Sequence, residues 1–412
     1  FGHGRGGIIG DVLGNILKFL GQKTTKEYYI NDAGAQIQKL GISFKIRCQQ
    51  QLGLAVELPE DAYHGDYLIV LAKKCIEEYG KDILEKSDSF FTDYAKNYLL
   101  EQIKKTLSDF GITFNVWFSE SELHKSGSIE HAVNTLKERG YVYEKDNALW
   151  FKATAFGDEK DRVIRKATGE WTYIAPDTAY LVNKVERGFT HLVMVLGHDH
   201  HSYAARLEAI RQGLGIKAPL SIILYQLVKI KASGKLVRMA KRAGHIITLQ
   251  DVVDTVGKDV ARFFYLNRKA DSQLEFDIDL ALKKTEENPV YYVQYAYVRT
   301  NSILEKAAQE KPLHTITRSD ITLIGREEAW LLKKIVSLKS LLHTIATNYQ
   351  THLLTYYLIE LATIFHRYYS KHRIIELDSI EQSRSRLLLT TILNKTFALC
   401  LDLLGISKPK KM

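Results

Sequence analysis

Apolar positions follow two spacings in the first two thirds of the chain. Apolar runs at residues 192–196 and 222–228, the second broken only by Gln226, are typical of strands buried in a parallel sheet. Other segments have apolar residues at every third or fourth position, which is the spacing of a helix packed on one side. One of these helices is expected to begin near Ala35 and to be capped by Asn31 and Asp32. The two spacings together predict an α/β domain.

Two regions show the helical spacing without the strand-type runs. Residues 42–110 show it almost throughout, which we interpret as a helical insertion between two halves of the α/β domain. After Pro289 it continues through residues 331–342, and from residue 281 onwards glycine occurs only at Gly325 and Gly405. The C-terminal region is therefore predicted to be an all-α helical bundle.

Composition narrows the class of partner. The 412 residues carry a net charge of +9, which favours a polyanionic ligand because neutralising phosphates releases counterions. Cys48, Cys75 and Cys400 are scattered, so we expect no zinc site, no disulfide framework and a reducing, cytoplasmic setting. No apolar run reaches the length of a membrane span, so no membrane contact is expected. Because the chain begins at Phe1, we interpret it as N-terminally truncated.

Two short segments have the chemistry of phosphate binding. Residues 2–7 are rich in glycine and open a helix, where free N–H groups and the helix dipole attract an anion beside His3 and Arg5. Arg238 and Lys241 lie on a glycine-flanked basic loop whose cations can close over a triphosphate. A plain N-terminal turn and a solvated basic turn are the simpler alternatives.

Tyr173 and Asp177 have the chemistry of guanidinium binding. A guanidinium needs a fixed carboxylate with two parallel oxygens and an aromatic wall, and these residues, beside the rigid Pro176, offer both. Capping of the following helix by Asp177 is the simpler alternative. The turn at residues 197–203 follows a buried strand, at the sheet edge where ligands bind, but its histidines lack the spaced partners of a zinc site.

Aromatic and basic residues interleave at residues 292–299 and 366–373, inside the predicted bundle. Such segments suit the stacking of unpaired bases together with the pairing of phosphates. A bundle whose tyrosines lie partly in its core would show the same pattern, so both readings stay open at this point.

Eight segments in order resemble the class I aminoacyl-tRNA synthetases, and among them the bacterial arginyl-tRNA synthetases. Phe1-Gly-His3 is similar to the end of the His-x-Gly-His signature, and Arg238-Met-Ala-Lys-Arg242 to the Lys-Met-Ser-Lys loop. Phe114-Asn-Val-Trp-Phe-Ser-Glu120 and Gly197-His-Asp-His-His-Ser-Tyr203 resemble family blocks with one and two departures. Arginine replaces the first lysine of the loop and alanine its serine. The resemblance covers essentially the whole chain.

This resemblance implies a Rossmann-like α/β catalytic domain with an insertion, followed by an α-helical anticodon-binding domain. The expected boundaries are 1–45 for the first part of the catalytic domain, its first strand missing; 46–112 for the insertion; 113–232 for the second part; 233–285 for a connecting module with the signature loop; and 286–412 for the anticodon-binding domain. The implied reaction activates L-arginine with Mg²⁺–ATP and transfers it to tRNA(Arg), as a cytoplasmic monomer.

The resemblance also implies residue roles. Catalysis is assigned to His3, Lys241 and Arg238; ATP binding to Gly2, His3, Asp199, His200 and Lys241; arginine binding to Tyr173 and Asp177; and tRNA binding to Gln294, Tyr295, Arg299, Arg367, Tyr368 and Arg373. Two other functions stay open. The altered loop and the missing first histidine favour a tRNA-binding module without catalysis, whereas Asp177 argues against a class I synthetase of another specificity.

Overall fold

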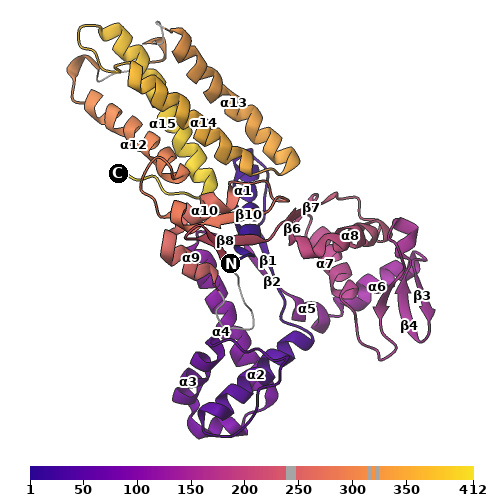
Figure 1. Ribbon diagram of the computed structural model, residues 1–412. Helices are drawn as coiled ribbons and strands as arrows, with labels where there is room; N and C mark the ends of the chain where they lie inside the picture. Colours follow the sequence, from indigo (N-terminus) through magenta and orange to yellow (C-terminus); the bar gives the residue numbers. More distant parts are fainter. Residues whose placement is uncertain (238–246, 314–316, 321–323) are drawn as a thin grey trace.

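Two pairs of parallel strands lie at the centre of the molecule (Figure 1). In this computed structural model, residues 1–237, 247–313, 317–320 and 324–412 are described, without the side chains of residues 200–202, 237 and 318. β1 (Glu27–Ile30) pairs with β2 (Val116–Ser119), and β6 (Leu192–Gly197) pairs with β7 (Leu220–Tyr225). The parallel strand predicted at residues 192–196 is confirmed.

The second predicted apolar strand, at residues 222–228, is in fact two strands. β7 ends at Tyr225, and β8 (Val228–Ala232) starts a separate sheet with β9 (Lys235–Val237) and β10 (Leu274–Asp277). The basic loop therefore follows an antiparallel hairpin and not the end of a parallel strand. Arg238 and Lys241 lie within residues 238–246, outside the described residues.

The insertion forms a separate helical lobe, at the bottom of Figure 1. It contains α2 (Ala35–Gln51), α3 (Tyr67–Tyr79) and α4 (Asp88–Asp109), packed around buried side chains that include Phe44, Leu71 and Phe91. α2 begins where predicted, but Gly34 is its N-cap and no side chain caps it. Asp32 instead accepts hydrogen bonds from Ser119 and Ser121, at the start of α5 (Glu120–Lys125).

A third lobe, on the right of Figure 1, combines helices with a small antiparallel sheet. Its helices pack around Leu136, Phe151 and Ile210 in one hydrophobic cluster. The elements are α5 (Glu120–Lys125), α6 (Ser128–Glu138), β3 (Val142–Lys145), β4 (Ala148–Phe151), β5 (Arg162–Arg165), α7 (Ile174–Glu186) and α8 (His201–Gly213).

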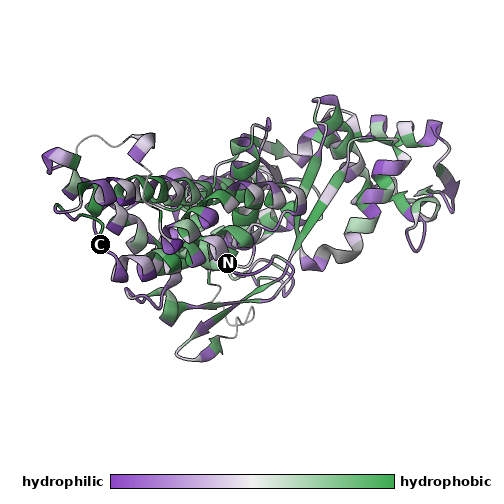
Figure 2. Cartoon of the chain, turned by 90° about the horizontal axis from the view of Figure 1, so that it is seen from above, coloured by the Kyte–Doolittle hydropathy of each residue, from purple (hydrophilic) through white to green (hydrophobic). Residues whose placement is uncertain are grey.

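The C-terminal region is a helical bundle, as its spacing predicts. Its helices are α12 (Pro289–Ala307), α13 (Arg326–Asn348), α14 (His352–Lys371) and α15 (Ile380–Leu404). α15 is long and apolar enough by composition to cross a membrane, which corrects the expectation that no such run exists. More than half of its most apolar window is buried, because Leu393, Phe397 and Leu401 face the inside of the bundle. Figure 2 shows hydrophobic residues concentrated on the central strands and within the bundle.

One hydrophobic core joins the bundle to the strands. α1 (Gly4–Phe19) lies in the middle of it, with Ile8, Val12 and Ile16 fully buried. The same cluster includes Tyr225 on β7, Phe263 on α10 (Lys258–Leu266) and Leu404 at the end of α15. α9 (Leu249–Val256) and the short α11 (Ile278–Ala281) complete this connecting region. The α/β half and the bundle are therefore packed as one body.

A buried arginine lies at this junction. The Arg262 side chain is inaccessible to solvent and donates to the carbonyl oxygens of Phe110, Gly111 and Leu404 and to the Asp11 carboxylate, at 2.5–3.1 Å. Gly405 makes this contact possible, because a Cβ there would lie 2.4 Å from Arg262 Nη2 and the residue has a φ of +66°. α1, α4, α10 and α15 are thus tied together by a single side chain.

Candidate functional site

His3 and Tyr225 meet although 222 residues separate them. His3 is the N-cap of α1, and its Nδ1 lies 2.9 Å from the hydroxyl of Tyr225 at the carboxyl end of β7. Gly6 allows the helix to come this close, because a Cβ there would lie 2.4 Å from the Tyr225 ring. The imidazole is therefore held at the sheet edge where α/β proteins bind ligands.

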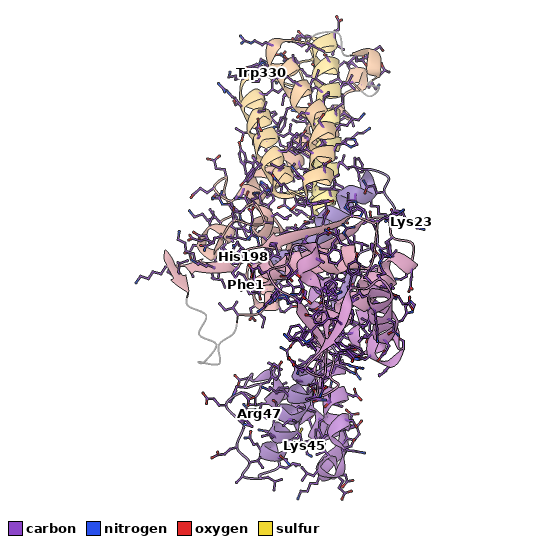
Figure 3. All side chains as sticks on the ribbon, turned by 90° about the vertical axis from the view of Figure 1, so that its right-hand side faces the viewer. Phe1, Lys23, Lys45, Arg47, His198 and Trp330 are labelled. Carbon is purple, nitrogen blue, oxygen red and sulfur yellow. The ribbon has the colours of Figure 1, made fainter. Side chains whose placement is uncertain are left out.

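Asp199 belongs to the same cluster. It is the second residue after β6, and a Cβ on Gly197 would lie 2.5 Å from Asp199 Oδ1 and 3.8 Å from the Tyr225 hydroxyl. Burial, followed by the charge of Asp199, raises the pKa of Tyr225 to about 12. Figure 3 shows His198, the preceding residue, and Phe1 at the middle of the molecule, between the bundle with Trp330 and the lobe with Lys45 and Arg47. The predicted ATP residues His3 and Asp199 are thus close together.

Two details of the expected phosphate site are corrected. The N–H groups of Gly4 and Arg5 are not free, because they donate to the carbonyl oxygens of Phe1 and Gly2 at 3.1 and 3.4 Å. Arg5 is fully buried and donates to the backbone carbonyls of Gln226, Arg268, Lys269 and Ser272. Arg5 therefore holds the fold together, and His3 is left as the side chain of this turn that can reach a ligand. Gly2 has open space around it, since a Cβ there would meet nothing within 4 Å.

Asp177 lies inside a helix and does not cap it. α7 begins at Ile174 with Tyr173 as its N-cap, so Asp177 follows in the first turn. The capping alternative for Asp177 is therefore excluded. Burial comes first, and the charge of Glu120 second, among the causes that raise the pKa of Asp177 to about 7. A buried carboxyl group whose pKa is raised this far above its usual value is typical of a functional site, here one suited to a cation.

Glu120 provides a second carboxyl group at this site. Its side chain is 14% exposed, and burial raises its pKa. The Tyr29 hydroxyl donates a hydrogen bond to Glu120, and the charges of both Glu120 and Asp177 help to raise the pKa of Tyr29. Tyr29 on β1, Glu120 on α5 and Asp177 on α7 thus converge from three elements and form an acidic cluster.

Aromatic rings pack beside this acidic cluster. The Tyr29 ring lies 4.8 Å from the Tyr180 ring, which lies 4.6 Å from the Phe118 ring. Glu27 accepts from the Tyr180 hydroxyl and from both Nη atoms of Arg187, at 2.6 and 3.1 Å. The Tyr173 side chain, by contrast, is 76% exposed at the start of α7.

Two cations lie behind Asp177. Burial lowers the pKa of Lys184 to about 8, and its Nζ lies 4.0 Å from the centre of the Tyr180 ring. Burial also lowers the pKa of Arg206, whose Nε has no hydrogen-bond partner among the described residues. Their charges lower the pKa of Asp177 against the larger effect of burial. Lys184 and Arg206 therefore offset only part of the effect of burial on the pKa of Asp177.

Three of the predicted tRNA residues line a cavity in the bundle. The cavity has a volume of about 720 Å³ and includes Tyr295, Arg299, Tyr369 and Arg373. The Arg299 guanidinium lies between two rings, 4.4 Å from the centre of Tyr295 and 4.7 Å from that of Tyr369. A planar cation between two tyrosines, next to Lys306, Lys371 and Arg373, matches the expected aromatic and basic surface.

The other predicted tRNA residues lie elsewhere. Arg367 is exposed on α14. Gln294 donates to Asp259 at 3.0 Å and to the Ser407 carbonyl at 3.1 Å, which fixes the C-terminal segment. Tyr368 is 3% exposed and donates to Glu328 at 2.9 Å inside the bundle, so it is corrected from an RNA contact to a core residue. Its neighbour Tyr369 lines the cavity in its place.

Three site residues were missed by the reading of the sequence. Tyr29 and Glu120 lie in strand-like segments, and Tyr225 lies inside the apolar run at residues 222–228. Glu120 and Tyr225 carry a signal, because a polar group that directly follows or ends a buried strand lies at the ligand-binding edge of the sheet. The His200 side chain is outside the described residues.

The chain matches known proteins over its whole length. The family model for tRNA synthetases class I (R), catalytic domain, matches residues 1–275, and that for the DALR anticodon binding domain matches residues 293–412. The arginine–tRNA ligase of Geobacillus kaustophilus is 42% identical over 420 aligned residues, which cover 100% of this chain and 75% of that protein. The Bacillus subtilis arginine–tRNA ligase is 40% identical over 417 residues, with the same coverage.

A solved structure agrees with these relatives. A Campylobacter jejuni protein, provisionally assigned as an arginyl-tRNA synthetase, superimposes with a TM-score of 0.91 at 33% identity, covering 100% of this chain and 90% of that one. The Thermus thermophilus arginyl-tRNA synthetase has a TM-score of 0.76 at 20% identity and shares the fold. The fold is thus that of a class I catalytic domain followed by a helical anticodon-binding domain, and the chain belongs to the arginyl-tRNA synthetases, the class I arginine–tRNA ligases.

Proposed function

We propose that the acidic cluster of Tyr29, Glu120 and Asp177 selects L-arginine, and that His3, Asp199 and the basic loop hold Mg²⁺–ATP. The observation that carries the proposal is the convergence of two carboxyl groups with raised pKa values beside packed aromatic rings. A guanidinium placed there satisfies both carboxylates with paired hydrogen bonds and removes their repulsion. Lysine, a compact single-point cation, cannot bridge two carboxylates in this way.

The reaction needs positioning more than proton transfer. The carboxylate of bound arginine attacks the α-phosphate of ATP, pyrophosphate leaves, and the terminal ribose hydroxyl of tRNA(Arg) then takes the arginyl group. His3 donates to the phosphates while Tyr225 fixes its ring, at 2.9 Å from Nδ1. Lys241 and Arg238 are assigned to neutralise the charge that develops as pyrophosphate leaves. Gly2 leaves room for the adenine, and Asp199 and His200 complete the nucleotide site.

The bundle is assigned to tRNA(Arg). The cavity around Arg299 offers rings for stacking and cations for phosphates, and it lies on the segment that matches the anticodon-binding family. Tyr173, exposed beside Asp177, is assigned to close the arginine site once substrate is present. We propose that the protein is a monomer in the cytoplasm. Its three buried cysteines form no disulfide, which agrees with a reducing compartment.

Arginine-dependent exchange of pyrophosphate into ATP tests this function directly. The assay compares this chain with a version extended upstream, each with and without tRNA(Arg), and uses lysine as the control amino acid. Exchange with arginine and not with lysine supports the proposal. Exchange by neither version, with tRNA still bound, would favour a tRNA-binding module without catalysis.

The affinity for arginine is expected to depend on pH through Asp177. A bound guanidinium favours the carboxylate, so binding releases the proton that the free acidic cluster holds below the pKa of about 7. The dissociation constant should be constant above about pH 8 and rise by up to about tenfold per pH unit below about pH 7. Calorimetric titrations of arginine across this range measure it, with ATP titrations as control. An affinity that does not change between pH 6 and pH 8 would contradict the assignment.

Tyr295 is expected to contribute base stacking. Replacing Tyr295 by alanine removes one ring from beside Arg299, and the loss of one stacked base weakens tRNA binding by about 1–3 kcal/mol. The matched control is Tyr295→Phe, which keeps the ring and loses only the hydroxyl. Filter binding of tRNA(Arg) at fixed salt measures both. Equal affinities for the alanine and phenylalanine variants would exclude stacking on this residue.

A further inference from the structure

A second contact joins the bundle to the central strands, at the end of β6 and β7 opposite to the ATP residues. Tyr349 lies between α13 and α14, and its hydroxyl lies 2.9 Å from His191 Nε2 and 3.1 Å from Ser221 Oγ. His191 Nε2 and Ser221 Oγ are themselves 3.2 Å apart. The three side chains therefore lie within hydrogen-bond distance of one another and join the bundle to both strands.

The backbone of Tyr349 is unusual. Its φ of +60° and ψ of 19° lie in the left-handed region, which a large side chain rarely adopts. The other non-glycine residues of positive φ in the described ranges, Asp146, Asn147 and Ser233, are small and polar and lie in hairpin turns. Glycine or asparagine would end α13 with less strain. A tyrosine held in this conformation points to a use for its side chain.

The two strands connect this contact to the nucleotide site. His191 directly precedes β6, and Ser221 is the second residue of β7. At their other ends, β6 leads into Asp199 and β7 ends at Tyr225, which holds His3. Tyr225 lies four positions after Ser221, a span of about 13 Å along a strand. A shift of both strands at Tyr349 therefore moves the residues that face ATP.

The proposed arginine site is carried by other elements. Tyr29 lies on β1, Glu120 on α5 and Asp177 on α7, and among the described residues none of these three forms a hydrogen bond or ring contact with Tyr349. The cavity around Arg299 lies between α12 and α14 and does not include Tyr349. A change at Tyr349 is therefore expected to alter the binding of ATP and not the binding of arginine or tRNA.

We propose that Tyr349 is a positioning residue for ATP: through His191 and Ser221 it anchors β6 and β7 to the bundle, so that Asp199 and Tyr225 with His3 are correctly placed. The inference rests on the proposed role of His3 and Asp199 in binding ATP. It assigns to the bundle a part in nucleotide binding besides its part in binding tRNA.

The test measures three affinities of the Tyr349→Phe protein, by calorimetric titration of ATP and of arginine and by filter binding of tRNA. The phenylalanine keeps the ring and the backbone conformation and loses the hydroxyl. ATP affinity should fall about fivefold, the size expected for one or two lost hydrogen bonds. Arginine and tRNA affinities should stay within about twofold. A merely structural role would weaken all three together or none, and either result would overturn the proposal.

Two further variants sharpen the result. Ser221→Ala should also weaken ATP binding, and the double variant should lose less than the sum of the two single losses, because the contact between Tyr349 and Ser221 is common to both. Additive losses would contradict a shared contact. Tyr356→Phe is the matched control: its hydroxyl, on α14, lies 3.5 Å from the Asn267 carbonyl and contacts neither strand, so ATP affinity should not change.

Asp199→Ala separates this inference from the function on which it rests. If Asp199→Ala leaves ATP affinity unchanged, the nucleotide site itself is wrongly assigned. If Asp199→Ala weakens ATP binding and Tyr349→Phe does not, the site stands and the positioning role of Tyr349 is refuted.

Discussion

Replacing Asp177 by alanine is expected to abolish measurable selection of arginine while ATP binding stays largely intact. Removing one partner of a desolvated, hydrogen-bonded charge pair weakens binding by about 2–5 kcal/mol, which is roughly 30- to 5,000-fold in affinity. Glu120 would still attract the cation, but the guanidinium would lose one of its two fixed carboxylates. Calorimetric titration of arginine, followed by titration of ATP on the same preparation, measures both affinities.

The Asp177→Asn variant separates a binding role from a folding role. It keeps the size of the side chain and removes the charge, so arginine binding should be nearly as weak as in the alanine variant. Because the pKa of Asp177 is raised to about 7, its ionised form is destabilising in the free protein at neutral pH, and the asparagine variant should melt no lower than the parent. Unchanged arginine affinity, or a large loss of thermal stability with it, would refute the assignment.

Replacing Arg262 by alanine is expected to destabilise the whole chain. Its guanidinium fills four hydrogen-bonding positions with no exposure to solvent, and alanine would leave three carbonyls and Asp11 without that donor. Lys26, at 2.6 Å, would be the remaining cation beside Asp11. Breaking a buried ion pair from one side typically costs about 3–5 kcal/mol. Urea unfolding followed by circular dichroism measures the loss.

A surface arginine provides the control for Arg262. Arg384 is 38% exposed, lies 3.8 Å from Asp320 and is expected to change stability by less than about 1 kcal/mol when replaced by alanine. Equal losses for Arg262→Ala and Arg384→Ala would mean that the buried network contributes little. If Arg262→Ala destabilises the bundle alone and leaves the α/β half as stable as before, the junction does not link the two halves.

Local spacing predicted most helices and strands, because burial on one face leaves a period in the sequence. It failed where a residue's partners are distant. Arg5 looked like an anion ligand beside a glycine-rich turn, yet its four carbonyl partners lie more than 220 residues away. Glu120 and Asp177 lie on separate helices, and the pairing of their elements is not visible in either segment.

Tyr368 shows a failure of a different kind, since the signal was present. The buried stripe of α14 passes through Leu358, Leu361 and Phe365, and the next position on that stripe is Tyr368. Tyr369, one position on, turns away from the stripe towards the cavity. Helical phase therefore separates the core tyrosine from the one that faces the cavity, whereas residue type alone does not.

The hydrophobic core shared by α1, α10 and α15 limits the exchange of domains between members of this family. A bundle transplanted from a relative of other specificity would bring its own contacts for Leu404 and Gly405, while Ile8, Val12 and Arg262 of the recipient stayed unchanged. Packed cores tolerate few changes of volume on one side alone. Substitutions around the cavity of Tyr295, Arg299 and Tyr369 are therefore expected to be tolerated better than substitutions at the buried junction.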